Sequence, residues 1–304
     1  MNQSTRKGRS NIAASIRQKI KNQAVHGKRP FAELLQYYAM ERFLYRLTQS
    51  SYAEQFILKG ALMLRVWQSP QFRPTMDIDM LGITSNDIDD ICAQIADIIY
   101  VKVDDGLVFD LVTIRGEKIK EDADYEGVRV RFIGTLDNAR VNLQIDVGFG
   151  DIIHPEPIKA ELPTILDLPA PKLLCCSRES AIAEKFEAMI KLRELNSRMK
   201  DFYDIWLLSR QFEFDGDKLA EAIRLTLENR DTKVPDIITA FTDEFITLKD
   251  KQWAAFHKRL GQDFVPVNFS EIVAGVKVFL QPVVSALITG APFYHKWSVS
   301  DYWK

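Results

Sequence analysis

The stretch that decides the fold covers residues 75–81 and reads TMDIDML. Polar and apolar residues alternate along it, as they do along a half-buried β-strand, and residues two apart on a strand point to the same face. Asp77 and Asp79 therefore leave the sheet together while Ile78 enters the core. Two neighbouring carboxylates repel each other, and a hard cation such as Mg²⁺ (or Mn²⁺) relieves that repulsion. The stretch predicts a strand that carries a metal site.

A third carboxylate strengthens this interpretation. Residues 140–148 alternate between apolar and polar side chains and place Asp146 on the polar face of a second predicted strand. Phosphoryl transfer with two metals uses about three carboxylates around ions roughly 3.5–4 Å apart. We therefore expect Asp77, Asp79 and Asp146 to be metal ligands and catalytic residues. The alternative is a strand with a solvated acidic face, which a lone Asp-x-Asp would favour.

Periodicity outward from this stretch predicts an α/β (α+β) fold in two parts. The front half, 1–165, combines N-terminal helices over 12–25 and 31–47 with strands at 55–59, 75–81, 109–118, 127–136 and 140–148 and a helix over 86–100. The back half, 166–304, has helical patterns over 180–195, 200–210, 217–230, 234–243, 250–261 and 269–288. Prolines at 163, 169 and 171 predict a linker between a domain with a mixed sheet and a helical C-terminal domain.

Composition narrows the class of protein. The chain has 304 residues, of which 46% are hydrophobic and 27% are charged, so it is expected to be globular. The cysteines, at 92, 175 and 176, have no disulfide or zinc spacing, which indicates a reducing, cytoplasmic location. No apolar signal segment follows Met1, and the apolar stretch 276–288 is too short and interrupted to cross a membrane, so no membrane partner is expected.

The N-terminal arm is strongly basic. Eight basic residues precede the first acidic residue, Glu33: Arg6, Lys7, Arg9, Arg17, Lys19, Lys21, Lys28 and Arg29. Such an arm is able to contact nucleic-acid phosphates. The alternative, which is the more frequent case, is a solvated and partly disordered tail that keeps the chain soluble.

Several residues are candidates for binding nucleotide phosphates. Lys59-Gly60-Ala61 lies where a predicted strand turns into a helix, and a glycine there lets backbone N–H groups approach a phosphate. The alternative is a simple tight turn. Arg65 and Arg73, on either side of the next loop, are candidate nucleotide-binding cations.

The back half contributes three candidates. Lys185 lies beside an apolar helix face and is a candidate for neutralising triphosphate charge, or else it is a surface lysine paired with an acid. Asp201 and Asp204 share a helix face; Asp201 is also placed to cap the helix. Asp204 has apolar neighbours, and if it is buried it needs a partner, for which Lys185 and Arg198 are candidates.

The order of these blocks resembles the AbiEii/AbiGii toxin family of nucleotidyltransferases. The blocks are FILKGA at 56–61, RPTMDID at 73–79, AEK at 183–185 and RMKDFYD at 198–204, with YAMERFLYRL at 38–47 also similar to the family's start. The resemblance covers roughly residues 30–290. It implies a polymerase-β-like nucleotidyltransferase fold with a helical C-terminal domain, and a toxin in a bacterial toxin–antitoxin or abortive-infection (phage-defence) system, with an AbiEi-type antitoxin as partner.

The resemblance also implies roles for single residues. Gly60 would lie at the triphosphate turn, Asp77 and Asp79 would hold Mg²⁺, Lys185 would contact the phosphates, and Asp201 or Asp204 would be a later essential acid. The family's first block usually reads Gly-Gly-Thr or Gly-Gly-Ser, so residues 59–61 depart from it and lack the hydroxyl contact.

Three functions remain open at this stage. The first is transfer of a nucleoside monophosphate from a nucleoside triphosphate (NTP) to an acceptor hydroxyl, with RNA, such as the 3′ end of a tRNA, as acceptor. In that reaction Asp146 completes the metal site or activates the hydroxyl. The second is a kinase-like phosphotransferase that uses the same site. The third is an inactive module that binds a nucleotide without turnover.

Overall fold

Two compact units make up the chain in the computed structural model, which describes residues 3–70, 73–122, 125–300 and 302–304. The first unit contains Met1–Gly150 and Ile158–Cys175, and the second contains Asp151–Pro157 and Cys176–Lys304. Residues 166–175 therefore group with the first unit. The domain boundary expected at residue 165 stays a prediction.

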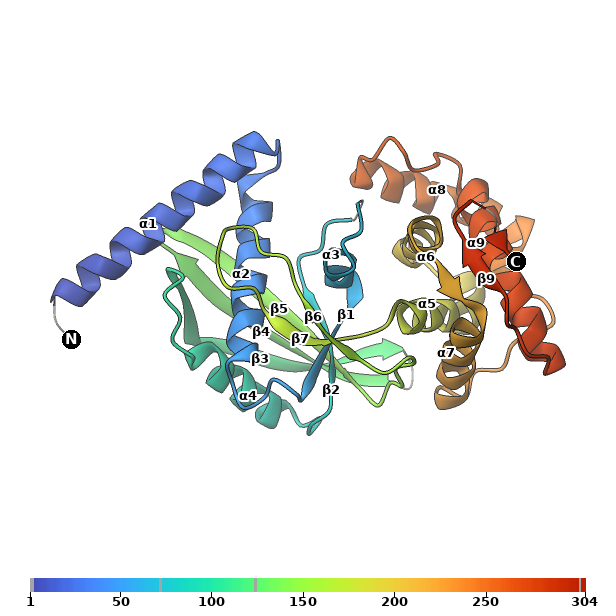
Figure 1. Ribbon diagram of the computed structural model, residues 1–304, viewed down its shortest axis with the longest axis horizontal. Helices are drawn as coiled ribbons and strands as arrows, with labels where there is room; N and C mark the ends of the chain where they lie inside the picture. The colour runs from blue at the N-terminus through green and yellow to red at the C-terminus, as the bar shows by residue number, and fades with distance from the viewer. Residues whose placement is uncertain (1–2, 71–72, 123–124, 301) are drawn as a thin grey trace. The chain divides into compact units, whose positions relative to one another are not determined.

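The first unit is built on a seven-stranded sheet (Figure 1). Its strands are β1 Phe56–Lys59, β2 Ile78–Gly82, β3 Leu107–Asp122, β4 Tyr125–Leu136, β5 Ala139–Phe149, β6 Ile158–Glu161 and β7 Lys172–Cys175. Their order is β3-β4-β5-β2-β1-β7-β6. The pairs β2–β5 and β1–β7 are parallel and the other pairs are antiparallel, so the sheet is mixed, as predicted.

Helices supply the rest of the first unit: α1 Gln3–His26, α2 Phe31–Thr48, the 3-10 turn η1 Gly60–Leu62, α3 Met63–Val66 and α4 Ile88–Tyr100. Helix α2 is buried along most of its length, including the predicted core residues Leu34, Leu35 and Phe43. Helix α1 begins at Gln3, so the alternative of a disordered tail is wrong for the arm's backbone. The side chains of Arg6, Lys7 and Arg9 lie outside the described residues.

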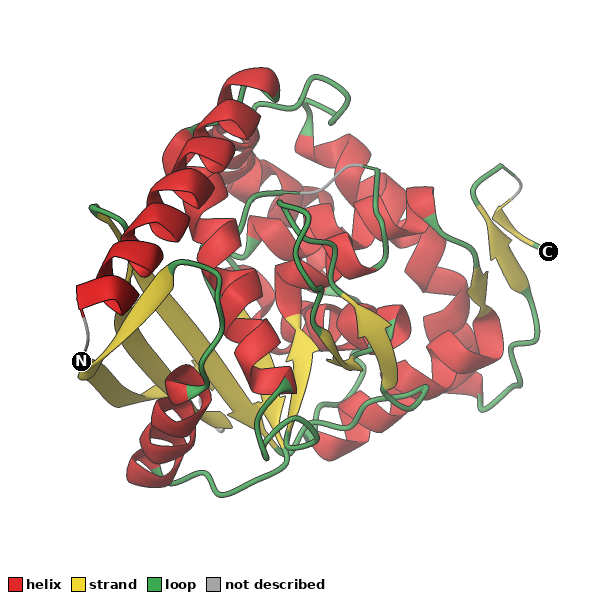
Figure 2. Ribbon diagram, turned by 60° about the vertical axis from the view of Figure 1, so that its left-hand side comes forward, coloured by secondary structure: helices red, strands yellow, loops and turns green. Residues whose placement is uncertain are grey.

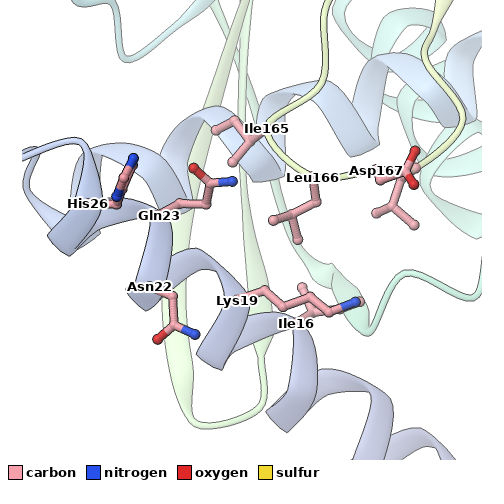
Figure 3. A pocket seen from close by; sticks show the side chains of 9 residues that line it. Ile16, Lys19, Asn22, Gln23, His26, Ile165, Leu166 and Asp167 are labelled. Atoms are coloured by element: carbon pink, nitrogen blue, oxygen red, sulfur yellow. The ribbon is translucent and has the colours of Figure 1, made fainter.

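Helix α1 and the loop between β6 and β7 enclose a hollow of about 490 Å³ (Figure 3). Helix α2 is hydrogen-bonded to this loop at two points. The Glu41 carboxylate accepts a hydrogen bond from the Ile165 backbone N–H at 2.8 Å, and Arg42 Nη2 donates to the Pro169 carbonyl at 2.9 Å. Burial raises the pKa of Glu41 to about 7, although Arg42 acts in the opposite direction.

Two expectations for the first unit need correction. The strand expected at 75–81 begins only at Ile78, so Asp77 directly precedes it. The linker expected at the prolines is wrong, because β7 returns to the sheet and pairs in parallel with β1, while β6 pairs with β7. Each of these two strands has four residues and no clear alternation, so periodicity does not reveal them.

The second unit is mainly helical, as predicted. Its helices are α5 Arg178–Leu192, η2 Arg193–Leu195, α6 Met199–Gln211, α7 Gly216–Asn229, η3 Thr239–Phe241, α8 Asp243–Leu260 and α9 Phe269–Thr289. A small antiparallel sheet, β8 Phe214–Asp215, β9 Lys296–Ser298 and β10 Tyr302–Trp303, lies near the C-terminus (Figure 2). The helix expected at 234–243 is wrong: only η3 forms there, because Pro235 and the β-branched residues after it disfavour a helix.

Helix α9 is 21 residues long, and by length and composition alone it could cross a membrane. It extends well beyond the short apolar stretch expected at 276–288. A core helix passes the same test, and Val276, Phe279, Leu280 and Val283 of α9 are fully buried in the second unit. We therefore describe α9 as a core helix of that unit.

Candidate active site

Three neighbouring segments of the sheet carry the predicted metal ligands. Asp79 lies on β2, where its Cα pairs with that of Asp146 on the parallel strand β5 and with that of Lys59 on β1. Asp77 lies just before β2. Because residues paired across a sheet project from the same face, the register brings Asp79 and Asp146 together.

The three carboxylates converge. Asp77, Asp79 and Asp146 each offer an oxygen, and these oxygens all lie within 4.8 Å of one another. Asp77 and Asp79 are half-buried, whereas Asp146 is 7% exposed. Oxygen donors that converge in this way are the ligands that Mg²⁺ and Mn²⁺ prefer, so the residues present fit a divalent ion. The predicted convergence is confirmed, and the metal-binding role stays a prediction.

Helix α2 fixes the segments that bear the acids. The buried Gln36 amide donates to the Met76 carbonyl at 2.9 Å and to the Asn142 carbonyl at 3.0 Å, and so ties the start of β2 to β5. The Thr75 backbone N–H donates to the Tyr37 hydroxyl at 3.1 Å, and the Thr75 hydroxyl donates to Asp77 at 2.5 Å. Sequence reasoning missed Gln36, because a buried polar residue on an apolar helix gives no local signal of what it contacts.

Arg129 is a second residue that sequence reasoning missed. It lies on β4, and its guanidinium donates to both oxygens of Asp146, at 2.8 and 2.6 Å. The hydrogen bond to Asp146 raises the pKa of Arg129. The alternation of Val128, Arg129 and Val130 could have placed Arg129 on the polar face of the strand expected at 127–136, but not next to Asp146, because that contact depends on the β4–β5 register.

Gly60 lies against the side chain of Asp79. Its φ is +68°, a left-handed conformation that residues with a Cβ rarely adopt. A Cβ built at this position would lie 1.8 Å from Asp79 Oδ2. The turn after β1 therefore needs glycine both for its backbone conformation and for the room that Asp79 occupies.

Of the other predicted nucleotide-binding residues, Lys59 and Ala61 flank Gly60, whereas Arg65 and Arg73 follow later in the chain. Lys59 ends β1 and is 9% exposed, Ala61 is buried in η1, and Arg73 is half-buried. Arg65 of α3 lies 4.9 Å over the ring of Tyr37 and donates to the Pro163 carbonyl at 3.1 Å. These contacts give Arg65 a structural role, and the nucleotide-binding roles of all four residues stay predictions.

Lys185 forms an ion-pair cluster with the buried Asp201 and Asp204 in the second unit. Lys185 Nζ on α5 lies 3.2 Å from Asp201 Oδ1 and 3.0 Å from Asp204 Oδ2 on α6. Arg198 Nε lies 2.9 Å from Asp201 Oδ2. Of the two candidate partners predicted for a buried Asp204, Lys185 contacts it and Arg198 contacts Asp201 instead. The predicted catalytic roles of Lys185, Asp201 and Asp204, and phosphate contact by Lys185, stay predictions.

Comparison with known proteins identifies a family whose model matches most of the chain. The family model described as "Nucleotidyl transferase AbiEii toxin, Type IV TA system" matches residues 42–275, which is more than half of the chain and includes the carboxylates of both units. No curated protein matches the chain.

Two solved structures are distantly similar to the chain. One is that of JHP933 from Helicobacter pylori, with a TM-score of 0.49, 14% identity and coverage of 84% of this chain and 94% of that one. The other is that of MenT4, a nucleotidyltransferase toxin from Mycobacterium tuberculosis, with a TM-score of 0.46, 15% identity and coverage of 92% and 99%.

Proposed function

The chain belongs to the AbiEii family of nucleotidyltransferase toxins of type IV toxin–antitoxin systems, and from this premise we propose how its reaction proceeds. A divalent ion, Mg²⁺ or Mn²⁺, binds at Asp77 and Asp79, and a nucleoside monophosphate passes from an NTP to an acceptor hydroxyl. One observation carries this proposal: three carboxylates from separate segments converge within 4.8 Å on one face of the sheet. Such a group of like charges is stabilised by a bound cation.

In the proposed reaction Asp77, Asp79 and Asp146 each have a separate role. When bound, the ion neutralises charge on the triphosphate and on the attacking oxygen. Asp77 and Asp79 would hold it, and the Thr75 hydroxyl orients Asp77 by a hydrogen bond. Asp146 faces the same point, where it completes the ligand set or accepts the proton of the acceptor hydroxyl.

The triphosphate is bound by the turn after β1. Gly60 brings the backbone of this turn against Asp79, and phosphate oxygens accept hydrogen bonds from backbone N–H groups at such turns. Lys59, Ala61 and Arg73 are proposed to contribute to nucleotide binding beside this turn. Lys185 is proposed as a further ligand of the phosphates. Residue 61 is alanine, so no side-chain hydroxyl contributes at that position.

The acceptor in this proposal is RNA, and specifically the 3′ end of a tRNA. A toxin that modifies tRNA in the cytoplasm stops translation, which accords with a role in phage defence. The basic residues of α1, including Arg17, Lys19 and Lys21, supply charge for binding phosphates. An antitoxin of the AbiEi type, encoded alongside, is the expected partner.

One experiment separates the candidate functions. The full chain is incubated with Mg²⁺, total RNA and each NTP, labelled either at the α-phosphate or at the γ-phosphate. Nucleotidyl transfer puts the α-label into RNA and leaves the γ-label in pyrophosphate. Transfer of the γ-label alone would identify a kinase-like phosphotransferase. Nucleotide binding without labelled product would identify an inactive module.

A further inference from the structure

Arg129 faces Asp146 from directly across the sheet. Their Cα atoms are partners in the antiparallel β4–β5 pair, so both side chains leave the same face. Nε of Arg129 donates to Oδ1 at 2.8 Å, and Nη2 donates to Oδ2 at 2.6 Å. A single planar guanidinium thus binds both oxygens of the most buried carboxylate of the three.

Asp77 and Asp146 are held in different ways. Asp77 Oδ1 accepts a hydrogen bond from the uncharged Thr75 hydroxyl. Asp146 accepts two charge-assisted bonds from Arg129, and Oδ2 also lies 3.3 Å from the Gln144 amide. Charge-assisted, bidentate bonds are stronger than neutral ones, so drawing Asp146 onto an ion costs more free energy than drawing Asp77.

The position of the guanidinium also affects a second ion. In two-metal sites the ions lie roughly 3.5–4 Å apart and share carboxylates. Arg129 places a fixed positive charge at the carboxylate that a second ion would share, and like charges repel at such distances. Mg²⁺ by itself is satisfied by one or two carboxylates with water.

We infer that Arg129 is a positioning residue that reserves Asp146 in the nucleotide-free enzyme. One divalent ion then binds through Asp77 and Asp79, and Arg129 excludes a second ion. This inference rests on the proposed function, because it takes the three acids to be the metal site.

Manganese titration tests the inference without reference to activity. Mn²⁺ is added to the nucleotide-free full chain, and free Mn²⁺ is followed by electron paramagnetic resonance. The wild-type chain is expected to bind one Mn²⁺. Arg129→Met keeps much of the apolar stem and removes the charge, and it is expected to bind a second Mn²⁺ or to bind the first at least about tenfold more tightly.

Two further variants serve as controls. Arg129→Lys keeps a positive charge opposite Asp146 and is expected to restore binding of a single ion. Arg115→Met removes an exposed arginine of β3 whose guanidinium donates to the Val112 and Ile114 carbonyls, and it is expected to behave as the wild type does.

The outcomes are distinct. Two tight Mn²⁺ ions on the wild-type chain would overturn the inference, even if Arg129→Met failed to fold. Unchanged stoichiometry and affinity in a folded Arg129→Met chain would also overturn it. Asp77→Ala examines the proposed function separately: undiminished Mn²⁺ binding there would remove the metal site itself, whereas its loss would leave only the role of Arg129 to be decided by the Arg129 variants.

Discussion

Each unit gathers acidic side chains, but the two clusters differ in what those acids face. In the first unit three carboxylates face one another, with oxygens within 4.8 Å. In the second unit Asp201 and Asp204 face cations of the chain, because Lys185 lies within 3.2 Å of both and Arg198 meets Asp201. Arg129 also pairs with Asp146, so the first cluster sets three carboxylates against this arginine, whereas the second sets two carboxylates against Lys185 and Arg198. An excess of like charge would be offset by a cation from solution.

Burial separates the clusters in the same way. The side chains of Asp201 and Asp204 are 1% and 4% exposed, and charges buried to that degree need partners from the chain. Asp77 and Asp79 are half-buried, so an ion and a nucleotide from solution are able to reach them. Close acids therefore favour a metal site where the carboxylates outnumber the cations of the chain that face them. The second cluster is accordingly structural in its contacts, whatever else it does.

Removal of Asp79 should have the largest effect on catalysis. We expect Asp79→Ala to lower nucleotide incorporation by roughly 10³-fold or more, because an ion ligand at the reacting phosphate is lost. The free energy of unfolding should change by less than about 1 kcal/mol, since a half-buried member of a like-charge cluster is removed. Labelled-NTP incorporation and thermal unfolding measure the two effects.

Asp104→Asn is the matched control for Asp79→Ala, because Asp104 is an exposed acid of the same unit. Its incorporation rate should equal that of the wild type. Full turnover in the Asp79→Ala chain would show that the three acids are not the catalytic centre.

Removal of Lys185 should have the opposite signature. In Lys185→Met two buried carboxylates lose a shared cation, so we expect the free energy of unfolding of the second unit to fall by about 3 kcal/mol. Urea denaturation measures it, with the exposed Lys200→Met of α6 as control. Unchanged stability together with lost incorporation would identify Lys185 as a phosphate ligand and not a structural cation.

Substitution of Gly60 examines how closely the first cluster is packed. Gly60→Ala places a Cβ where Asp79 Oδ2 now lies, and a displacement of about 1 Å at a reacting centre costs roughly 10²-fold in rate. Gly261→Ala is the control, because Gly261 also has a positive φ but has nothing within 4 Å of the added Cβ. Gly60→Ala should lose more stability than Gly261→Ala, because it adds a clash to the same backbone strain, and equal rates in the two would contradict the proposed contact.

The smallest expected effect concerns Glu41, a buried acid beside Arg42. The charge of Arg42 lowers the pKa of Glu41 by less than burial raises it. The pKa of Glu41 is raised to about 7 in the folded chain, so the unfolded chain releases this proton at lower pH than the folded chain does. The free energy of unfolding of the first unit should therefore fall by about 2 kcal/mol between about pH 5.5 and 7. Denaturation across this range measures the slope, and Glu41→Gln should flatten it. Parallel slopes in the two chains would show that Glu41 keeps its ordinary pKa.

Much of the first cluster could be predicted from local pattern. Alternation placed Asp77 and Asp79 on one face and Asp146 on the polar face of another strand, and the structure brings the three together. Long helices such as α2 and strands such as β5 could also be predicted. The spacing of their apolar residues along the sequence follows which side chains face the core. These features need no knowledge of which strands become neighbours.

What depends on distant pairing could not be predicted. The contact between Arg129 and Asp146 requires the β4–β5 register, and the tie made by Gln36 requires α2 to pack where β2 begins. The short strands β6 and β7 belong to the sheet only through β1, and nearby prolines suggested a linker. Local sequence predicts the face of the strand or helix on which a side chain lies, but not which distant residues it contacts there.

The parallel pairing of β2 with β5 also means that the three acids are joined only late in synthesis of the first unit. Asp146 follows Asp79 by 67 residues, and ribosomes add about 5–20 residues per second. A growing chain therefore carries the earlier two acids for several seconds before the third arrives with its strand. If the three acids form the catalytic centre as proposed, each new molecule is inactive until β5 has been made, and a product truncated before β5 stays inactive.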